Sequence, residues 1–338
     1  MTAILIGLAF GSILRYAKLN RFDTISGLAI LGDLTVAKAL AAAVGLGAIL
    51  VAVETVTGLG SFHLKPVILG GLVIGGIVFG TGMAILGYCP GTMAVSLGEG
   101  SIDALAGIAG GLAGGLVYTL SFPVIKSLAN PDLGSISLFS LLGNSRPLYL
   151  IATLIIGSLF IVLAFRLKGR VNNSGKRWLY AGIALAALNV FVNLSFVANH
   201  FIGASTAYPM VADFVTGFTG NPYFEKIKEP GTWELEFLGG AFLSGLILSI
   251  SSKEFRITTL HSNWIRFKGK SPLNRILWSF AGGFLLLFGA RMAGGCTSGH
   301  ILSGGMQLSV SSLVFTVFVF TGLVLTGKLF YNQKDVIK

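Results

Sequence analysis

The chain has 338 residues, of which 54% are apolar and only 11% are charged. A water-soluble domain cannot cover that much apolar material with polar surface, so the composition excludes a soluble globular protein. The formal net charge of +11 does not indicate nucleic-acid binding, because the basic residues gather in a few segments between apolar stretches. We expect an integral membrane protein surrounded by lipid, with no nucleic-acid partner.

Nine apolar stretches are candidate transmembrane helices, given that a bilayer core needs about 20 apolar residues per helix. In chain order they cover residues 2–17, 34–53, 66–88, 104–122, 148–165, 178–203, 236–252, 276–294 and 309–327. The first has no basic residue before it, which favours a retained span over a cleaved signal peptide. These spans leave no room for a soluble catalytic domain, so residues 1–338 are predicted to form a single transmembrane domain.

The charges between the spans predict the topology. Basic residues follow the first, fifth, seventh and ninth spans, and such segments belong on the cytoplasmic side. The loop 204–235 carries four acidic residues against two lysines, which suits the outer face. We therefore expect the N-terminus outside and the C-terminus in the cytoplasm.

The only two cysteines lie in similar surroundings, in Gly-Tyr-Cys-Pro-Gly-Thr at 87–92 and in Gly-Gly-Cys-Thr-Ser-Gly-His at 294–300. Aligning Cys89 with Cys296 superposes Gly75 on Gly282, Gly76 on Gly283, Gly82 on Gly289, Gly87 on Gly294 and Ser96 on Ser303. The two copies are five spans apart, an odd number, so they cross the membrane in opposite directions.

Two inverted, pseudo-twofold repeats are therefore predicted. The first comprises residues 1–125 and the second residues 178–338, joined by a connecting span and a cytoplasmic loop at 126–177. Inverted repeats with glycine-interrupted segments at matching positions indicate a transporter whose binding site lies near the bilayer midplane.

Each cysteine motif is predicted to interrupt a helix. Pro90 removes a backbone donor and Gly91 loosens the chain where a span should finish. Irregular backbone at membrane depth is tolerated only where it is buried in protein or lines a cavity. A short helix starting near Thr92 would aim free N–H groups at Cys89, and such N-termini favour anions. In the second motif the same role is assigned to Thr297, Ser298 and Gly299.

Four interpretations of the thiols follow. A structural zinc site needs further ligands at close spacing, whereas the four histidines are scattered. A disulfide needs two loops that enter from opposite faces to come within bonding distance. An inert buried cysteine would have to occur twice at matching positions. The interpretation favoured here is a polarizable S–H or thiolate that contacts a soft sulfur-bearing solute while nearby N–H groups hold its charge.

Both motifs, with the glycine-rich spans before them and the Leu-Gly-Glu-Gly run at 97–100, resemble the YeeE/YedE family of bacterial inner-membrane transporters of sulfur compounds. The resemblance implies an all-α polytopic membrane protein with pseudo-twofold symmetry that takes up thiosulfate through a narrow central path. It further implies that cysteines pass the ion along by S–H contacts to its terminal sulfur. Carried over by position, that role falls on Cys89 and Cys296.

One position departs from the family pattern. The family often has a cysteine near the end of the first span, in a context such as Gly-Arg-Phe-Cys, whereas this chain has Asn-Arg-Phe-Asp at 20–23. An ionised Asp23 beside a divalent anion is repulsive, by about 4 kcal/mol for two like unit charges about 4 Å apart at an effective dielectric constant of about 20. Four explanations remain open for Asp23. Its carboxyl group is protonated, it faces a cation such as Arg21, or it is solvated at the cytoplasmic end of the span. The fourth is that the protein transports a different solute.

Four further residues are candidates for the path. Arg291 lies inside an apolar span. We expect it either to contact the solute, to pair with an acidic side chain, or to extend toward the membrane–water interface. His300 ends the second motif and either gates passage near neutral pH or packs as a cap. Ser205 and Thr206 correspond to the region around Asp23 and either offer hydroxyls to the path or form an ordinary turn before a proline.

The sequence thus predicts a transporter or channel-like facilitator of a small sulfur-containing anion, with thiosulfate as the first candidate. We expect no enzymatic activity, cofactor or metal. No phosphate-binding loop for ATP is present. One alternative is a membrane sulfur-relay protein that carries a persulfide on Cys89, and another is the same scaffold with a different solute. A small cytoplasmic sulfur-carrier or sulfurtransferase protein is an implied partner.

Overall fold

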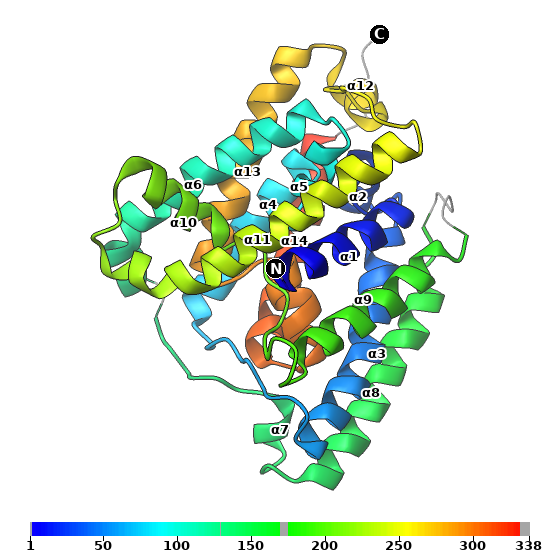
Figure 1. The fold of residues 1–338 in the computed structure, drawn as a ribbon, viewed down its shortest axis with the longest axis vertical. Helices are drawn as coiled ribbons and strands as arrows, with labels where there is room; N and C mark the ends of the chain where they lie inside the picture. Colours follow the sequence, from blue (N-terminus) through cyan, green and yellow to red (C-terminus); the bar gives the residue numbers. More distant parts are fainter. Residues whose placement is uncertain (1, 129, 170–174, 332–338) are drawn as a thin grey trace.

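In the computed structural model, which describes residues 2–128, 130–169 and 175–331, the chain is folded into helices and connecting loops (Figure 1). The described residues contain no β-strand, only isolated bridges. Part of the predicted cytoplasmic loop, residues 170–174, and the basic tail at 332–338 lie outside the described residues. The predicted all-α class is confirmed.

The first half of the chain, up to the loop after the sixth helix, contributes α1 (Thr2–Tyr16), α2 (Phe22–Ala29), α3 (Thr35–Thr57), α4 (Leu69–Leu86), α5 (Pro90–Gly98) and α6 (Ile102–Leu128). The middle of the chain adds α7 (Leu138–Leu141) and α8 (Arg146–Arg166). The second half contributes α9 (Arg177–Asn193), α10 (Ala207–Thr216), α11 (Pro222–Ser251), α12 (Ser262–Lys268), α13 (Pro272–Met292), the π-type helix η1 (Thr297–Gly304) and α14 (Val310–Phe330).

Seven segments of the described chain are long and apolar enough to cross a membrane. They are α3, α4 together with α5, α6, α8, α11, α13 and α14. All nine predicted spans coincide with helices, but α1 has 15 residues and α9 has 17, short of a full bilayer crossing. The protein is therefore a multi-pass membrane protein with seven candidate full-length spans in the described residues, and the predicted count of nine is not confirmed.

Helix packing follows a paired pattern. The central pair is α4 with α13, and α4 also packs on α14 as α13 packs on α6. The contact between α3 and α9 corresponds to the contact between α11 and α1. In the same way, the contact between η1 and α3 corresponds to the contact between α5 and α11. Helix α8 lies outside this scheme against α3, so that α3, α8 and α9 gather on one side of the molecule and α6, α10 and α13 on the other (Figure 1).

Glycines bring α4 and α13 into close contact. A Cβ on Gly75 would lie 2.7 Å from the Gly289 carbonyl oxygen, and a Cβ on Gly82 would lie 2.7 Å from that of Gly282. In the cysteine alignment Gly75 matches Gly282 and Gly82 matches Gly289, so exchanging the halves converts one contact into the other. A twofold axis between the two halves would produce such self-complementary pairing, and small residues at the crossing allow the backbones to approach.

Candidate functional site

The first cysteine motif forms a sharp break between two helices. Helix α4 ends at Leu86, Gly87 adopts a φ of 76° that favours glycine, and α5 begins at Pro90 with Cys89 as its N-cap. The Thr92 hydroxyl oxygen accepts a hydrogen bond from the Cys89 backbone N–H at 2.7 Å and lies 3.3 Å from Cys89 Sγ. The predicted short helix is therefore present, and the Cys89 thiol is half-buried at its N-terminus.

The second motif repeats this arrangement with a different helix type. Helix α13 ends at Met292, Gly294 has a φ of 74°, and Cys296 is the N-cap of η1. Cys296 is buried, and its Sγ lies 3.2 Å from the Ser298 hydroxyl oxygen. A short helix thus follows each cysteine.

The fold brings the two motifs together. Both Cys296 and Thr297 of the second motif are neighbours of the Cys89 thiol. Tyr208 at the start of α10 is close to both thiols and donates a hydrogen bond from its hydroxyl to the Pro90 carbonyl at 3.0 Å. Both cysteines are free, and the described residues hold no group of three or more histidine, cysteine or acidic side chains that could bind a metal.

His300 is fully buried and uses both ring nitrogens for contacts within the protein. Nε2 lies 2.9 Å from the Ala293 carbonyl oxygen, which can only accept, so Nε2 carries the proton. Nδ1 therefore accepts from the Ser312 hydroxyl at 3.0 Å, and the ring packs on Phe315. Both ring nitrogens are thus engaged within the protein, as the capping interpretation of His300 expects.

A polar cluster beyond Cys296 contains three of the predicted residues. The Arg291 guanidinium donates to the hydroxyls of Ser205 at 3.1 Å and Thr206 at 3.0 Å, and to Tyr223 at 2.9 Å. The buried Glu234 carboxylate accepts from the Thr206 backbone N–H and from the Thr206 hydroxyl at 3.1 Å. Ser205 and Thr206 therefore do more than form a turn, and Arg291 faces the protein interior.

The sequence analysis missed Lys65, which lies in the loop between α3 and α4. Its Nζ donates to the Gly294 carbonyl at 2.8 Å and is close to Cys296, Arg291 and Glu234. A lone lysine just before a span resembles an ordinary loop residue, so only its position in the fold identifies it. Glu234 and Tyr208 were missed for the same reason, since the partners of each lie far away in the sequence.

The serines that align in the two halves support the correspondence between Asp23 and Ser205. Ser96 donates from its hydroxyl to the Asn20 carbonyl at 2.7 Å, and Ser303 donates to the Ile202 carbonyl at 2.8 Å. Asp23 and Ser205 each lie three residues after the accepting carbonyl. The two segments therefore occupy matching places beside the two short helices.

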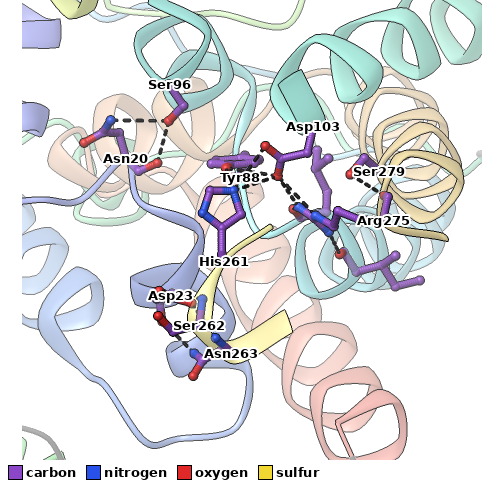
Figure 2. A network of polar contacts seen from close by, with 12 residues as sticks. Asn20, Asp23, Tyr88, Ser96, Asp103, His261, Ser262, Asn263, Arg275 and Ser279 are labelled. Atoms are coloured by element: carbon purple, nitrogen blue, oxygen red, sulfur yellow. Dashed lines mark hydrogen bonds and ion pairs between the residues drawn. The ribbon is translucent and has the colours of Figure 1, made fainter. Parts of the chain in front are cut away.

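Asp23 is engaged by another helix (Figure 2). Its carboxylate accepts from the backbone N–H groups of Asn263 at 2.7 Å and Ser262 at 3.3 Å, at the start of α12. No ion pair joins Asp23 to Arg21 among the described residues. The Asp23 charge therefore faces the N-terminus of α12, where negative charge is favourable.

A buried ion pair lies beneath the first motif (Figure 2). Arg275 Nη2 is 2.7 Å from Asp103 Oδ2, and both side chains are fully buried. The same guanidinium donates to the carbonyls of Ile85 at 3.1 Å and Leu86 at 2.6 Å, which end α4. Asp103 also lies 3.1 Å from the Tyr88 hydroxyl and from His261 Nε2, which fixes the residue that precedes Cys89.

A polar cavity of about 420 Å³ opens at this end of the molecule. Tyr88, Asp23 and His261 lie in its wall, together with basic residues from the segments after α1 and after α11. Both segments are predicted to be cytoplasmic, and Arg15 joins them through a 2.8 Å ion pair with Glu254. The cavity therefore lies where the two predicted cytoplasmic segments meet.

Comparisons with known proteins identify the family of the chain. The family model described as sulphur transport matches residues 22–325, which include both cysteine motifs. The thiosulfate transporter TsuA of Spirochaeta thermophila is 27% identical, over 95% of this chain and 96% of that protein. The resemblance to the YeeE/YedE transporters is thereby confirmed, and the chain belongs to the sulphur transport family.

Proposed function

We propose that the protein takes up a small sulfur-containing anion across the bacterial inner membrane, and that this anion is thiosulfate. The observation that carries the proposal is the meeting of two helix breaks, each with a cysteine at the N-cap of a short helix. The similarity to a thiosulfate transporter over almost the whole chain supports the choice of solute. The N-terminus lies outside and the C-terminus in the cytoplasm, as the basic segments require.

The path runs between two inverted repeats, residues 1–125 and 178–338. The paired helix contacts and the reciprocal glycine contacts of α4 and α13 support this division. Solute arrives at the cluster around Arg291, Ser205 and Thr206, passes Cys296 and Cys89, and leaves through the cavity beside Tyr88.

The two motifs offer the chemistry that a sulfur oxyanion requires. The thiols are soft, polarizable groups that suit the terminal sulfur, and the free N–H groups at the starts of α5 and η1 suit the charged oxygens. Pro90, Gly91 and Thr92 shape the first cradle, and Thr297, Ser298 and Gly299 shape the second. The carboxylates of Asp23 and Glu234 repel an anion less than free carboxylates would, since backbone N–H groups face both of them.

Uptake of labelled thiosulfate by a bacterial strain without its own importers tests this proposal. The parent protein is expected to restore uptake, and Cys89→Ala and Cys296→Ala are each expected to lower it at least about tenfold, the loss that follows from removing one well-placed hydrogen bond at a charged solute. Equal uptake by both variants and the parent would show that the two cysteines only pack in the interior and do not contact the solute. The amount of protein in the membrane is measured for each variant.

A sulfur relay is the second candidate, because the Cys89 thiol is half-buried whereas Cys296 is buried. In that reaction the Cys89 thiolate attacks the terminal sulfur of thiosulfate, a persulfide forms, and sulfite leaves with the electron pair of the broken S–S bond. A small cytoplasmic sulfur-carrier protein would then accept the sulfur. Mass spectrometry after incubation with thiosulfate separates the two functions, since relay adds one sulfur atom to Cys89 and transport leaves the thiol unmodified.

A further inference from the structure

A cation caps the helix that precedes each cysteine. Arg275 donates to the last carbonyls of α4, those of Ile85 and Leu86, before Cys89. Lys65 donates to the carbonyl of Gly294, just after the end of α13 and before Cys296. Carbonyl groups at a helix C-terminus carry partial negative charge, so cations are favourable at both places. Each cation comes from the segment at or just before the first turn of the partner helix.

The two cations differ in whether a carboxylate neutralises their charge. Arg275 is fully buried, and its charge is neutralised by Asp103 at 2.7 Å. Lys65 is only half-buried, and no carboxylate of the described residues lies within 4.0 Å of its Nζ. An ammonium has three donors, and Lys65 uses one of them on the Gly294 carbonyl. Lys65 therefore retains two donors for a ligand.

The backbone of the second motif leaves room for this ammonium group. A Cβ on Gly295 would collide with Lys65 Nζ, and a Cβ on Gly299 would lie 2.8 Å from it. The aligned positions of the first motif are Tyr88 and Thr92, which carry side chains. A cation thus approaches the second motif at two positions where side chains fill the first.

The remaining charges around Lys65 leave the site positive. Arg291 and Glu234 both lie near Lys65, so that two cations face one carboxylate. The Arg291 donors are directed to Tyr223, Ser205 and Thr206. Lys65 is thus a cation of this cluster that directs only one of its three donors into the protein, at the end of α13 beside Cys296.

We propose that Lys65 binds the charged oxygens of the solute beside Cys296, whereas the neutralised Arg275 provides no such hold beside Cys89. The inference rests on the proposed transport function and assigns the selectivity for a doubly charged anion to one end of the path. A dianion is held at Lys65 while its terminal sulfur meets the Cys296 thiol, and beside Cys89 it meets no such hold from Arg275, whose charge Asp103 neutralises.

Initial rates of thiosulfate uptake into proteoliposomes test Lys65 directly. Lys65→Met is expected to raise KM about tenfold or more, the effect of losing one charge-assisted hydrogen bond to a charged ligand. Lys65→Arg keeps the charge and is expected to stay within about threefold of the parent, on the same grounds. Lys126→Met, on the exposed last turn of α6, removes an equal charge away from the cluster and is expected to leave KM unchanged.

Competition by methanethiosulfonate, a monoanion with the same terminal sulfur, adds a second readout. The parent is expected to prefer thiosulfate, and Lys65→Met is expected to lose most of that preference. If Lys65→Met keeps both the KM and the preference for thiosulfate of an active parent, the proposed role of Lys65 is wrong, and the transport function still stands. Absence of uptake by the parent would instead overturn the transport function itself. Rescue by Lys65→Arg, with equal elution profiles of the purified variants, separates lost binding from misfolding.

Discussion

Asp23 stands where the YeeE/YedE pattern often places a third cysteine, and its carboxylate caps α12. The N-cap residue of that helix, His261, makes no side-chain cap of its own. Asp23 supplies the missing acceptor from α2, so the aspartate joins the segment between α11 and α13 to the first half of the chain. A structural role for this carboxylate removes the need to assume a different solute.

Substitution of Asp23 tests this role through stability. Asp23→Ala removes the acceptor and is expected to destabilise the protein by about 1 kcal/mol, the usual cost of losing a helix cap. Asp23→Asn retains one acceptor oxygen and is expected to lose less. Thermal unfolding in detergent measures both variants, and an Ala variant as stable as the parent would show that the cap contributes nothing.

The buried pair of Arg275 and Asp103 makes a second prediction at the residue scale. Removing one partner leaves a buried charge without its counterion, so Arg275→Met and Asp103→Leu are each expected to cost about 3–5 kcal/mol. The double variant is expected to cost less than the sum of the two, because no uncompensated charge remains. A double-mutant cycle measured by thermal unfolding supplies the coupling energy, and strictly additive losses would contradict a direct interaction.

Sequence reasoning at this scale succeeded for residues within a motif and failed for residues whose partners lie elsewhere. The cysteine motifs carry their proline and glycine breaks locally, so the short helices could be predicted. Arg291 stood out as a charge in an apolar span. Lys65 and Arg275 look like ordinary loop lysines and arginines, because only the tertiary fold brings them to the ends of α13 and α4.

Among the helices, α4 and α13 cross close to the motifs, and the crossing depends on glycine. A Cβ on Gly82 would collide with the Leu286 backbone nitrogen and lie 2.7 Å from the Gly282 carbonyl oxygen. Because backbone atoms cannot move aside as a side chain can, Gly82→Ala is expected to separate the two helices. Since both helices lead into the cysteine motifs, the separation also moves the thiols apart.

Gly82→Ala is accordingly expected to lower both the unfolding temperature and thiosulfate uptake. Gly239→Ala in α11 is the matched control, because no heavy atom lies within 4 Å of a Cβ at that position. The control is expected to keep the stability and uptake of the parent. Equal behaviour of the two variants would mean that the α4 and α13 contact is not tight.

Each of the nine predicted apolar stretches coincides with a helix, but the apolar pattern did not predict the lengths of these helices or the short helices α10 and α12. Helix α11 begins at Pro222, well before the predicted span at 236–252, and continues through Pro230. Its first turns carry charged residues, so hydropathy alone marks them as loop. Helices α10 and α12 were not predicted as elements, because segments of seven to ten residues carry too little periodicity to separate them from loops.

For the whole molecule, the paired helix contacts and the reciprocal glycine contacts describe two related halves. The halves are not equivalent electrostatically, since Asp103 compensates Arg275 and no carboxylate of the described residues pairs with Lys65. Under the proposed transport function, the two halves provide two cysteine motifs, and the difference in charge gives the path a direction. The aligned glycines led to the prediction of inverted repeats, whereas this difference in charge depends on residues outside the alignment.

The location of bound solute tests most directly whether the two thiols border one route. Selenosulfate carries selenium in place of the terminal sulfur of thiosulfate, and anomalous diffraction from crystals soaked with it reveals the selenium position. The strongest peak is expected in contact with Sγ of Cys89 or Cys296, with the oxygens toward Lys65 or the N–H groups of the short helices. Selenium peaks that touch neither sulfur atom would contradict the account.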